Sequence, residues 1–288
     1  MQFLSPDSSI DYQLIDSGRF RKLERFGQLI LDRPEIKAKW EPSRSKKEWE
    51  SADWHFYEKK GKTGLWTTKN NAPSSWAIDY NFQGNPFTFL LKITSFKHVG
   101  IFPEQAVNWN FMQQQLQRIR GEKKVLNLFA YTAAASIIAA KCGAKVTNVD
   151  SVKQVINWGK ENAQLNRIDS IRWIQEDARK FVDRAIRRKD SYHGIILDPP
   201  TFGYGAKNEK WLIDQDLFPL IEKLSLLLNP DAHFFILNTY SSKMSFSSLD
   251  SGLKKIIKLP KSNEKSTLGL CSEDGTKLAL GELLRFWH

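Results

Sequence analysis

From residue 123 onward, apolar runs and amphipathic segments alternate along the chain. The run over 125–131 has no two-residue period, which is typical of a strand buried on both faces of a sheet. We expect further strands over 144–150, 171–177, 195–197 and 234–237, and helices over 133–142, 153–165, 178–188 and 216–228. Two strand-like runs between 268 and 287 are expected to form a hairpin at the sheet edge. This alternation predicts an α/β fold with a doubly wound, mainly parallel seven-stranded sheet.

The first 95 residues follow another pattern, in which short alternating segments are separated by turn residues. Strands are expected over 12–16 and 28–32, turns at Ser17-Gly18 and Phe26-Gly27, and a loop over 42–47. A strand over 87–93 and a helix from Pro103 to about residue 120 lead into the second part. We therefore expect a small, mostly β domain over 1–95 and a ligand-binding α/β domain over 96–288.

Composition narrows the class of protein. Hydrophobic residues make up 41% of the chain, so a sizeable core can form. The sequence has no apolar stretch of membrane-spanning length, no signal peptide at its start and only two cysteines, which favours a reducing, cytoplasmic setting. His55, His98 and His193 are isolated from any metal-like spacing, so we expect no metal site.

The net charge of +11 indicates which class of partner the protein binds. A strongly basic chain is attracted to polyanions, and nucleic acid is the commonest of these. An enzyme with a solvated basic surface is the alternative. Basic residues interleaved with aromatics in the first part suit looped or single-stranded RNA: Arg19, Arg21, Lys22, Arg25, Lys46, Lys47, Lys59, Lys60 and Lys62 among Trp40, Trp49, Trp54, Phe56, Tyr57 and Trp66. For most of these aromatics, we favour a place in the core.

Ligands of open α/β sheets bind beyond the carboxyl ends of the strands, so the strand ends carry the candidate chemistry. The first strand runs into small residues from Ala133 to Ser136, which let a ligand approach the backbone. Asp150 ends the second strand, where an acid can bind the hydroxyls of an adenosine ribose. Asp177 follows the third strand, where it can accept a hydrogen bond from an adenine amino group. For both acids, a helix N-cap is the alternative.

The fourth strand ends in the most informative stretch, Asp198-Pro199-Pro200-Thr201-Phe202. Two prolines directly after a buried strand stiffen the backbone and prevent a helix from continuing. We expect the carbonyls there to have no local donor, so that Asp198 and the Pro199 carbonyl can accept hydrogen bonds from a substrate amine. Phe202 and Tyr204 can then stack on a planar base.

Together these stretches resemble class I S-adenosylmethionine-dependent methyltransferases with a Rossmann-like fold, and more closely the ribosomal RNA large subunit methyltransferases of bacteria. The resemblance covers about 123–245. It rests on the motifs Val125-Leu126-Asn127-Leu128-Phe129-Ala130-Tyr131-Thr132, Val149-Asp150-Ser151, Glu161-Asn162 with Leu165-Asn166, Gln175-Glu176-Asp177-Ala178 and Asp198-Pro199-Pro200-Thr201-Phe202.

The resemblance implies S-adenosylmethionine as cofactor and assigns roles to residues. The turn over 129–132 holds the methionine part, Asp150 the ribose and Asp177 the adenine, while Asp198 faces the substrate. The catalytic candidates are Asp198, Pro199, Pro200 and Phe202. The candidates for cofactor contact are Phe102, Gln105, Asn127, Phe129, Ala130, Tyr131, Thr132, Ser136, Asp150, Ser151, Asp177, Ala178 and Asp198.

Two departures from the family bear on the activity. Ala133 stands where the family usually has glycine, and its methyl group is expected to crowd the methionine carboxylate. Methylation of cytosine C5 requires a cysteine nucleophile, which relatives carry after the fifth strand, whereas this chain has Asn238-Thr239-Tyr240-Ser241-Ser242 there. We therefore predict methylation of a base nitrogen of RNA, ribosomal RNA above all.

Other functions stay open at this point. A nicotinamide-dependent oxidoreductase shares the sheet and Asp150, but it predicts a glycine-rich turn that is absent here. A methyltransferase of a protein or small molecule and a non-catalytic RNA-binding relic of the fold are the further alternatives. The sequence leaves the oligomeric state open.

Overall fold

The computed structural model describes residues 2–7, 9–59, 63–69, 71–82, 84–205, 207–241 and 244–288. Within these residues the chain forms two compact units. The first contains Gln2, 108–267 and 281–288, and the second contains 3–107 and 268–280. The chain therefore passes between the units after residue 2, after residue 107 and again after residues 267 and 280. The expected domain boundary between residues 95 and 96 remains a prediction.

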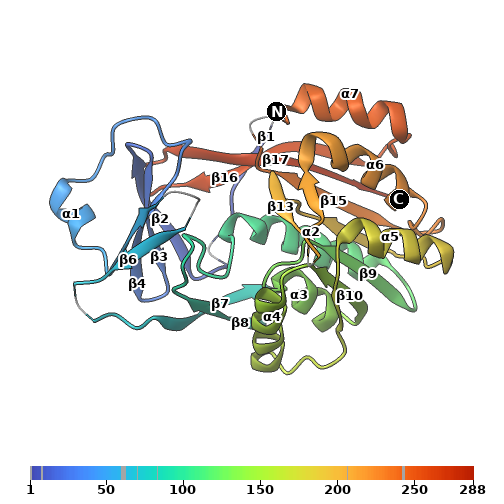
Figure 1. The fold of residues 1–288 in the computed structure, drawn as a ribbon, viewed down its shortest axis with the longest axis horizontal. Coiled ribbons are helices and arrows are strands. Elements are labelled where there is room, and N and C mark those ends of the chain that lie inside the picture. The colour runs from blue at the N-terminus through green and yellow to red at the C-terminus, as the bar shows by residue number, and fades with distance from the viewer. Residues whose placement is uncertain are drawn as a thin grey trace. The chain divides into compact units, whose positions relative to one another are not determined.

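The largest sheet has the mainly parallel, doubly wound order predicted from the sequence (Figure 1). The predicted seven strands are present, and a short strand at the edge makes an eighth. In spatial order they are β1 (Gln2–Leu4), β16 (Asn263–Cys271), β17 (Lys277–Trp287), β15 (Phe234–Thr239), β12 (Gly194–Leu197), β9 (Lys123–Leu128), β10 (Ala144–Asp150) and β11 (Arg172–Gln175). The pairs from β11 to β15 are parallel, whereas β17 pairs antiparallel with β15, as expected for a closing hairpin.

The register of the central strands aligns their carboxyl ends. Leu128 of β9 lies opposite both Val149 of β10 and Leu197 of β12. The next residue on each strand therefore reaches the same edge of the sheet. Because β9 precedes both neighbours in the chain, the strand order reverses beside it, which is where ligands of such sheets bind.

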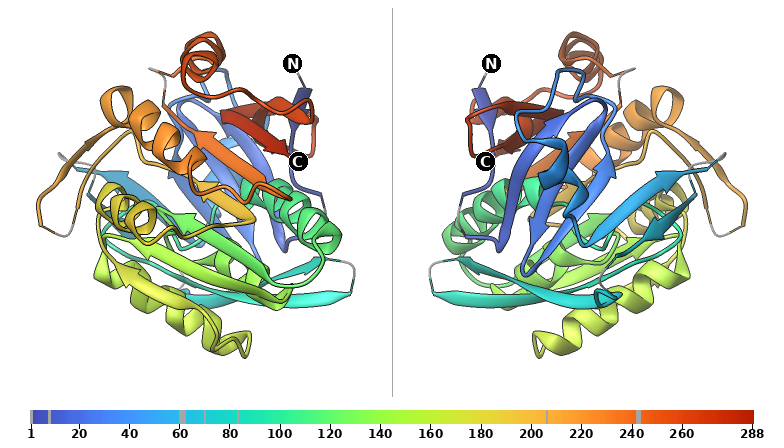
Figure 2. Two further views of the ribbon diagram at one scale, coloured as in Figure 1. Left: turned by 90° about the vertical axis from the view of Figure 1, so that its right-hand side faces the viewer. Right: turned by 90° about the vertical axis from the view of Figure 1, so that its left-hand side faces the viewer.

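Helices cover both faces of this sheet (Figures 1 and 2). They are α2 (Ala106–Arg118), α3 (Ala134–Lys141), α4 (Lys153–Leu165), α5 (Ala178–Arg187), α6 (Ile213–Ser225) and α7 (Phe246–Ile256). The apolar faces of α5, α6 and α7 share one buried cluster with β9, β12 and β15. The helices α3 and α4 contact each other on the opposite face. None of the helices in the described residues combines the length and apolar character that a membrane crossing requires.

Two elements of the first unit were not predicted. A hairpin of β13 (Phe202–Tyr204) and β14 (Lys210–Leu212) follows the two prolines, and α6 begins directly after it rather than at Asp216. The helix α7 lies in a segment whose serines gave no clear period; Ser245 caps it by accepting a hydrogen bond from Ser248 N–H.

The second unit is mostly β, as its alternating pattern predicted. One sheet has the order β2 (Tyr12–Gly18), β3 (Arg21–Phe26), β4 (Leu29–Pro34), β5 (Trp54–Glu58) and β6 (Gly64–Thr67); β7 (Ser75–Phe82) and β8 (Asn85–Lys92) form a two-stranded sheet. The unit also contains the helix α1 (Lys46–Glu50) and the 3₁₀ helix η1 (Pro103–Gln105). Trp54, Phe56 and Trp66 are buried and in edge-to-face contact, as expected for core aromatics. Of the other three, Trp40 and Trp49 are half-buried and Tyr57 is exposed, so a place in the core holds for three of the six.

The turn expected at Ser17-Gly18 is wrong. Both residues belong to β2, and the chain turns at Arg19 and Phe20, which have left-handed φ values of 47° and 62°. A Cβ at Gly18 would lie 2.4 Å from the backbone nitrogen of Pro42. This glycine therefore permits close approach of a neighbouring loop and is not a turn residue.

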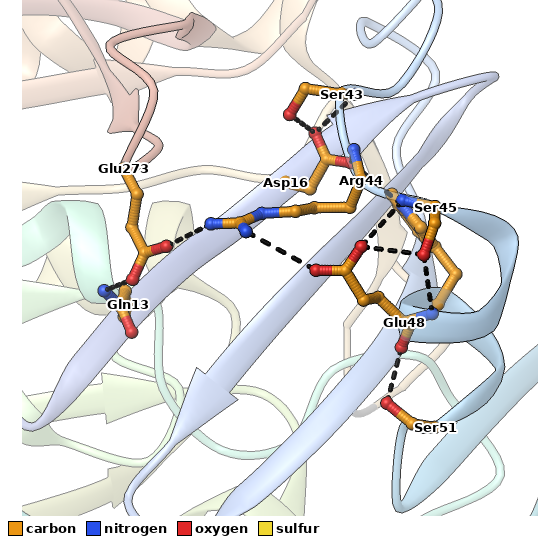
Figure 3. Close-up of polar contacts among 9 residues, drawn as sticks. Gln13, Asp16, Ser43, Arg44, Ser45, Glu48, Ser51 and Glu273 are labelled. Atoms are coloured by element: carbon orange, nitrogen blue, oxygen red, sulfur yellow. Dashed lines mark hydrogen bonds and ion pairs between the residues drawn. The ribbon is translucent and has the colours of Figure 1, made fainter.

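The loop before α1 is held to β2 by the buried carboxylate of Asp16 (Figure 3). It accepts hydrogen bonds from the backbone N–H groups of Ser43 and Arg44 and from Trp49 Nε1. Arg44 in turn bridges Glu48 and Glu273. A buried carboxylate that accepts several hydrogen bonds holds the loop in one conformation, so we interpret this cluster as structural.

Candidate functional site

The turn after β9 has an unusual backbone. Phe129, Tyr131 and Ala133 all adopt left-handed φ values, of 55°, 50° and 68°. The turn is closed by hydrogen bonds from Ala130 N–H to the Val149 carbonyl at 3.2 Å and from Ala133 N–H to the Ala130 carbonyl at 3.0 Å. A left-handed conformation costs a non-glycine residue roughly 1–2 kcal/mol. Three such residues in one turn indicate strain retained at a functional site.

A buried polar network supports this turn from below. Asn127 Nδ2 donates to Ser136 Oγ at 3.0 Å, and Ser136 Oγ donates to Asn148 Oδ1 at 2.7 Å. All three side chains are buried. Asn127 and Ser136, two candidates for cofactor contact, thus bond to each other and to β10 beneath the turn.

The far end of the turn is attached to α4. Asn162 Nδ2 donates to the Thr132 carbonyl at 3.1 Å. Ala133 is fully buried, and a Cβ added at Gly159 of α4 would lie 3.0 Å from the Ala133 methyl carbon. The methyl group is therefore directed at α4, which removes the reason to expect that it crowds a ligand.

Asp150 joins the turn to the second strand end. Its Oδ2 accepts the Tyr131 N–H and its Oδ1 accepts the Val152 N–H, both at 2.9 Å. Burial raises the pKa of Asp150 above its ordinary value, although the backbone N–H groups act in the opposite direction. The adjacent Ser151 Oγ donates to the Tyr204 carbonyl at 3.4 Å, so the strand end also contacts the hairpin.

Asp177 has the cap geometry that was its alternative interpretation. Its carboxylate accepts hydrogen bonds from the Arg179 and Lys180 N–H groups at the start of α5, where Ala178 is buried. Arg179 also forms an ion pair with it at 3.0 Å. Any contact of Asp177 with adenine would therefore be made by a carboxylate that already caps a helix.

The Asp198-Pro199-Pro200 corner follows β12 at the same edge. Asp198 is half-buried, Pro199 is buried and Pro200 is exposed. The expectation that these carbonyls lack a local donor is wrong for one of them, because Trp211 Nε1 donates to the Pro200 carbonyl at 2.7 Å. The donor was missed because it stands on the hairpin that the sequence pattern did not reveal.

The hairpin presents two aromatic rings beyond this corner. Phe202 and Tyr204 expose 39% and 59% of their surface, and their rings meet edge to face with centroids 5.0 Å apart. Two adjoining exposed rings offer a surface on which a planar base can stack. The hairpin is fastened to α5 by the ion pair of Glu209 and Lys180 at 2.5 Å, and the hydrogen bond from Lys180 lowers the pKa of Glu209 to about 2.

Trp211 is a site residue that the sequence analysis missed. It is buried, with its ring 4.8 Å from that of Phe129 and the Arg179 guanidinium over it at 5.8 Å. One side chain thus contacts the turn after β9, the start of α5 and the Pro200 carbonyl. No local signal marks it, because these partners are 11 to 82 positions away in the sequence.

The remaining candidates lie in the second unit. Phe102 caps η1, Gln105 ends it, and the contact of either residue with the cofactor remains a prediction. Of the basic residues expected to face RNA, Arg19, Arg21 and Lys22 form ion pairs with Glu41, Asp32 and Glu24. Lys60 and Lys62 lie outside the described residues, whereas Arg25, Lys46, Lys47 and Lys59 are exposed.

Comparisons with known proteins agree with this geometry. The family model of S-adenosylmethionine-dependent methyltransferases matches residues 68–242. The ribosomal RNA large subunit methyltransferase K/L of Shewanella frigidimarina is 34% identical over 154 residues, which are 52% of this chain and 21% of that protein. The chain thus matches about a fifth of the length of such relatives.

Solved structures extend the similarity over nearly the whole chain. A SAM-dependent methyltransferase from Agrobacterium tumefaciens has a TM-score of 0.91 and 34% identity, covering 99% of this chain and 93% of that one. A putative SAM-dependent methyltransferase from Streptococcus mutans shares the fold, with a TM-score of 0.73 and 18% identity over 98% of this chain and 76% of that one.

Proposed function

Because the chain belongs to the S-adenosylmethionine-dependent methyltransferases, we propose that it methylates RNA, with a base nitrogen of ribosomal RNA as the acceptor. The observation that carries this proposal is the alignment of the left-handed turn, Asp150 and the Asp198-Pro199-Pro200 corner along one sheet edge, next to two exposed aromatic rings. A base-sized acceptor can be held there between a carboxylate and an aromatic platform.

The cofactor, S-adenosylmethionine, supplies an electrophilic methyl group when bound. The chain's residues fit it: a half-buried carboxylate at the second strand end accepts hydrogen bonds well, and the turn over 129–132 brings backbone close to the crevice. We assign Asp150 and Ser151 to the ribose, the turn to the methionine part, and Asp177 with Ala178 to the adenine. Asn127 and Ser136 act by holding the turn in place.

At the acceptor side, the chain's task is to position a nucleophile. Asp198 and the Pro199 carbonyl accept hydrogen bonds from an amino group of the base, while Phe202 and Tyr204 stack on its ring. The Pro200 carbonyl is occupied by Trp211, which holds the corner in place. A base within folded RNA must first leave its stack, and exposed aromatics offset part of that cost.

RNA as the substrate is supported by three observations. Curated relatives that are 31–34% identical to this chain are named as ribosomal RNA large subunit methyltransferases, the chain carries a net charge of +11, and aromatic rings are exposed beside the corner. This substrate also implies a cytoplasmic place of action.

Transfer to cytosine C5 is excluded from the proposal. Of the two cysteines, Cys142 is half-buried just after α3, and burial raises its pKa, which makes it a poor nucleophile. Cys271 ends β16 and does not follow the fifth strand, where the resemblance places a cysteine nucleophile.

Substitution of Asp198 tests the proposal. In Asp198→Ala, we expect methyl transfer to large-subunit ribosomal RNA from a strain lacking the gene to fall at least about 100-fold, because the acceptor loses its alignment. Binding of S-adenosylmethionine, measured by calorimetry, should remain detectable, because the turn over 129–132 and Asp150 are unchanged. Asp169→Ala, which removes an exposed acid of the same unit, is the matched control. Full transfer by Asp198→Ala would refute the role of the corner, and activity on protein or small molecules alone would refute RNA as the substrate.

A further inference from the structure

A hollow of about 570 Å³ at the end of α7 is not used by the proposed reaction. Four lysines line it, Lys254, Lys255, Lys258 and Lys265, and its described lining contains no acidic side chain. All of them belong to the first unit. Asn263 lines it as well, and its Nδ2 donates to the Pro260 and Lys261 carbonyls, which fixes the turn between α7 and β16.

The charge of the hollow is only partly compensated. Asp250 forms ion pairs with Lys254, at 2.6 Å, and with Lys265. Lys255 and Lys258 are exposed and form no ion pair within the described residues. One carboxylate thus pairs with two of the four lysines, and these five side chains together carry a net charge of about +3.

Compensation of the helix dipole does not account for this cluster. The carboxyl end of a helix carries a charge of roughly −0.5, which one or two lysines in the last turn offset. Lys254 and Lys255 occupy that turn. Lys258 and Lys265 lie beyond the helix, so the excess of positive charge is several times larger than the dipole requires.

We propose that this hollow, the lysine hollow, binds the phosphate backbone of the RNA substrate; this inference rests on the proposed function. Lysine ammonium groups are point charges that bind phosphates in many orientations, which suits a contact with the RNA backbone rather than recognition of a base. The 11 residues of α7 separate the hollow from the start of the helix by roughly 16 Å, at about 1.5 Å per residue. The lining belongs to α7, the turn after it and β16, and not to the strand ends of the candidate site, so we assign the contact to nucleotides other than the reacting base.

A contact with the phosphate backbone contributes to the affinity for RNA and not to the methyl-transfer step. In Lys255→Gln/Lys258→Gln, we expect the KM for large-subunit ribosomal RNA to rise about 5- to 20-fold, while kcat at saturating RNA stays within twofold. The slope of log K for RNA binding against log salt concentration should become shallower by about 1.5, since each phosphate contact contributes 0.7–0.9. The Kd for S-adenosylmethionine and the melting temperature verify that the variant is folded.

Arg187→Gln/Arg188→Gln is the matched control, because it removes the same charge from exposed residues at the carboxyl end of α5. The control should change the KM less than twofold. An unchanged salt slope in the lysine variant, or an equal rise in KM in the control, would overturn the proposal that the lysine hollow binds RNA. Methylation of RNA by the unchanged chain would in that case still support the proposed function. Failure of the unchanged chain to methylate any RNA would overturn both.

Discussion

At the scale of single residues, Trp211 shows how one side chain can connect two parts of a site. Its Nε1 holds the Pro200 carbonyl, and its ring lies against Phe129 in the turn that we assign to the cofactor. It touches neither reacting group in the proposed arrangement, so we interpret it as a positioning residue.

Trp211→Phe removes the Nε1–H donor to the Pro200 carbonyl, together with the five-membered ring of a buried indole, and keeps an aromatic ring next to Phe129. We expect kcat to fall about 10-fold with a nearly unchanged Kd for S-adenosylmethionine, because the corner loses its alignment. Trp76→Phe removes a comparable bond, from Nε1 to the Phe26 carbonyl at 3.1 Å in the second unit. Loss of the hydrogen bond should cost each variant about 1 kcal/mol of stability in denaturant unfolding. Trp211→Phe should lose more than Trp76→Phe, because Trp211 is buried and Trp76 is half-buried. An equal loss of kcat in both would indicate a merely structural role for Trp211.

Asp150 predicts a pH dependence of cofactor binding. Its pKa is raised by burial, so the folded chain holds this proton more tightly than the unfolded chain does. Ribose hydroxyls donate to the ionised form, so binding releases the proton and affinity rises with pH. The Kd for S-adenosylmethionine should fall as the pH increases from the ordinary aspartate value of about 3.9 toward neutrality. Asp150→Asn should bind weakly at every pH; a dependence that persists in this variant would assign it to another group.

At the scale of elements, the contact between the turn after β9 and α4 depends on two small residues. Ala133 fills the space that Gly159 leaves, and Trp173 occupies the other side at 3.0 Å from a Cβ at that position. The glycine is retained inside a helix, where it costs about 1 kcal/mol relative to alanine. Close packing of the turn therefore outweighs local helix propensity.

Gly159→Ala tests this contact through stability. We expect a net loss of about 1–2 kcal/mol in urea unfolding, because crowding against Ala133 and Trp173 exceeds the gain in propensity. The loss should be smaller by at least about 0.5 kcal/mol when Ala133→Gly is also present. Ala133→Gly alone should leave the Kd for S-adenosylmethionine within twofold, since the methyl group is directed at α4. Additive effects of the two substitutions would contradict the contact.

At the scale of the whole molecule, the two compact units differ in the features that they contain. The first carries the parallel sheet, the candidate site and the lysine hollow. The second keeps many charges in internal pairs: Glu24, although burial opposes its ionisation, has a lowered pKa because of Arg33 and Lys22. The paired cations of this unit are thereby held by its own acids, which leaves fewer of them available to contact RNA.

Apart from the β13–β14 hairpin and the start of α6, the amino-acid sequence determined the strands and helices between 123 and 239 and the residues at each strand end. Apolar runs and helical periods depend on residues near one another in the chain, and a parallel sheet places its carboxyl ends at one edge. Asp150 and the Asp198-Pro199-Pro200 corner were therefore found from the pattern, and the register brings them to that edge.

Only the tertiary structure decided how these residues are supported. The Trp211 bond to Pro200, the Asn127–Ser136–Asn148 network and the packing of Ala133 against Gly159 each join separate elements. Likewise, the loop that approaches Gly18 explains a glycine that looked like a turn. Such contacts depend on the packing of distant segments, which leaves no period or motif in the local sequence.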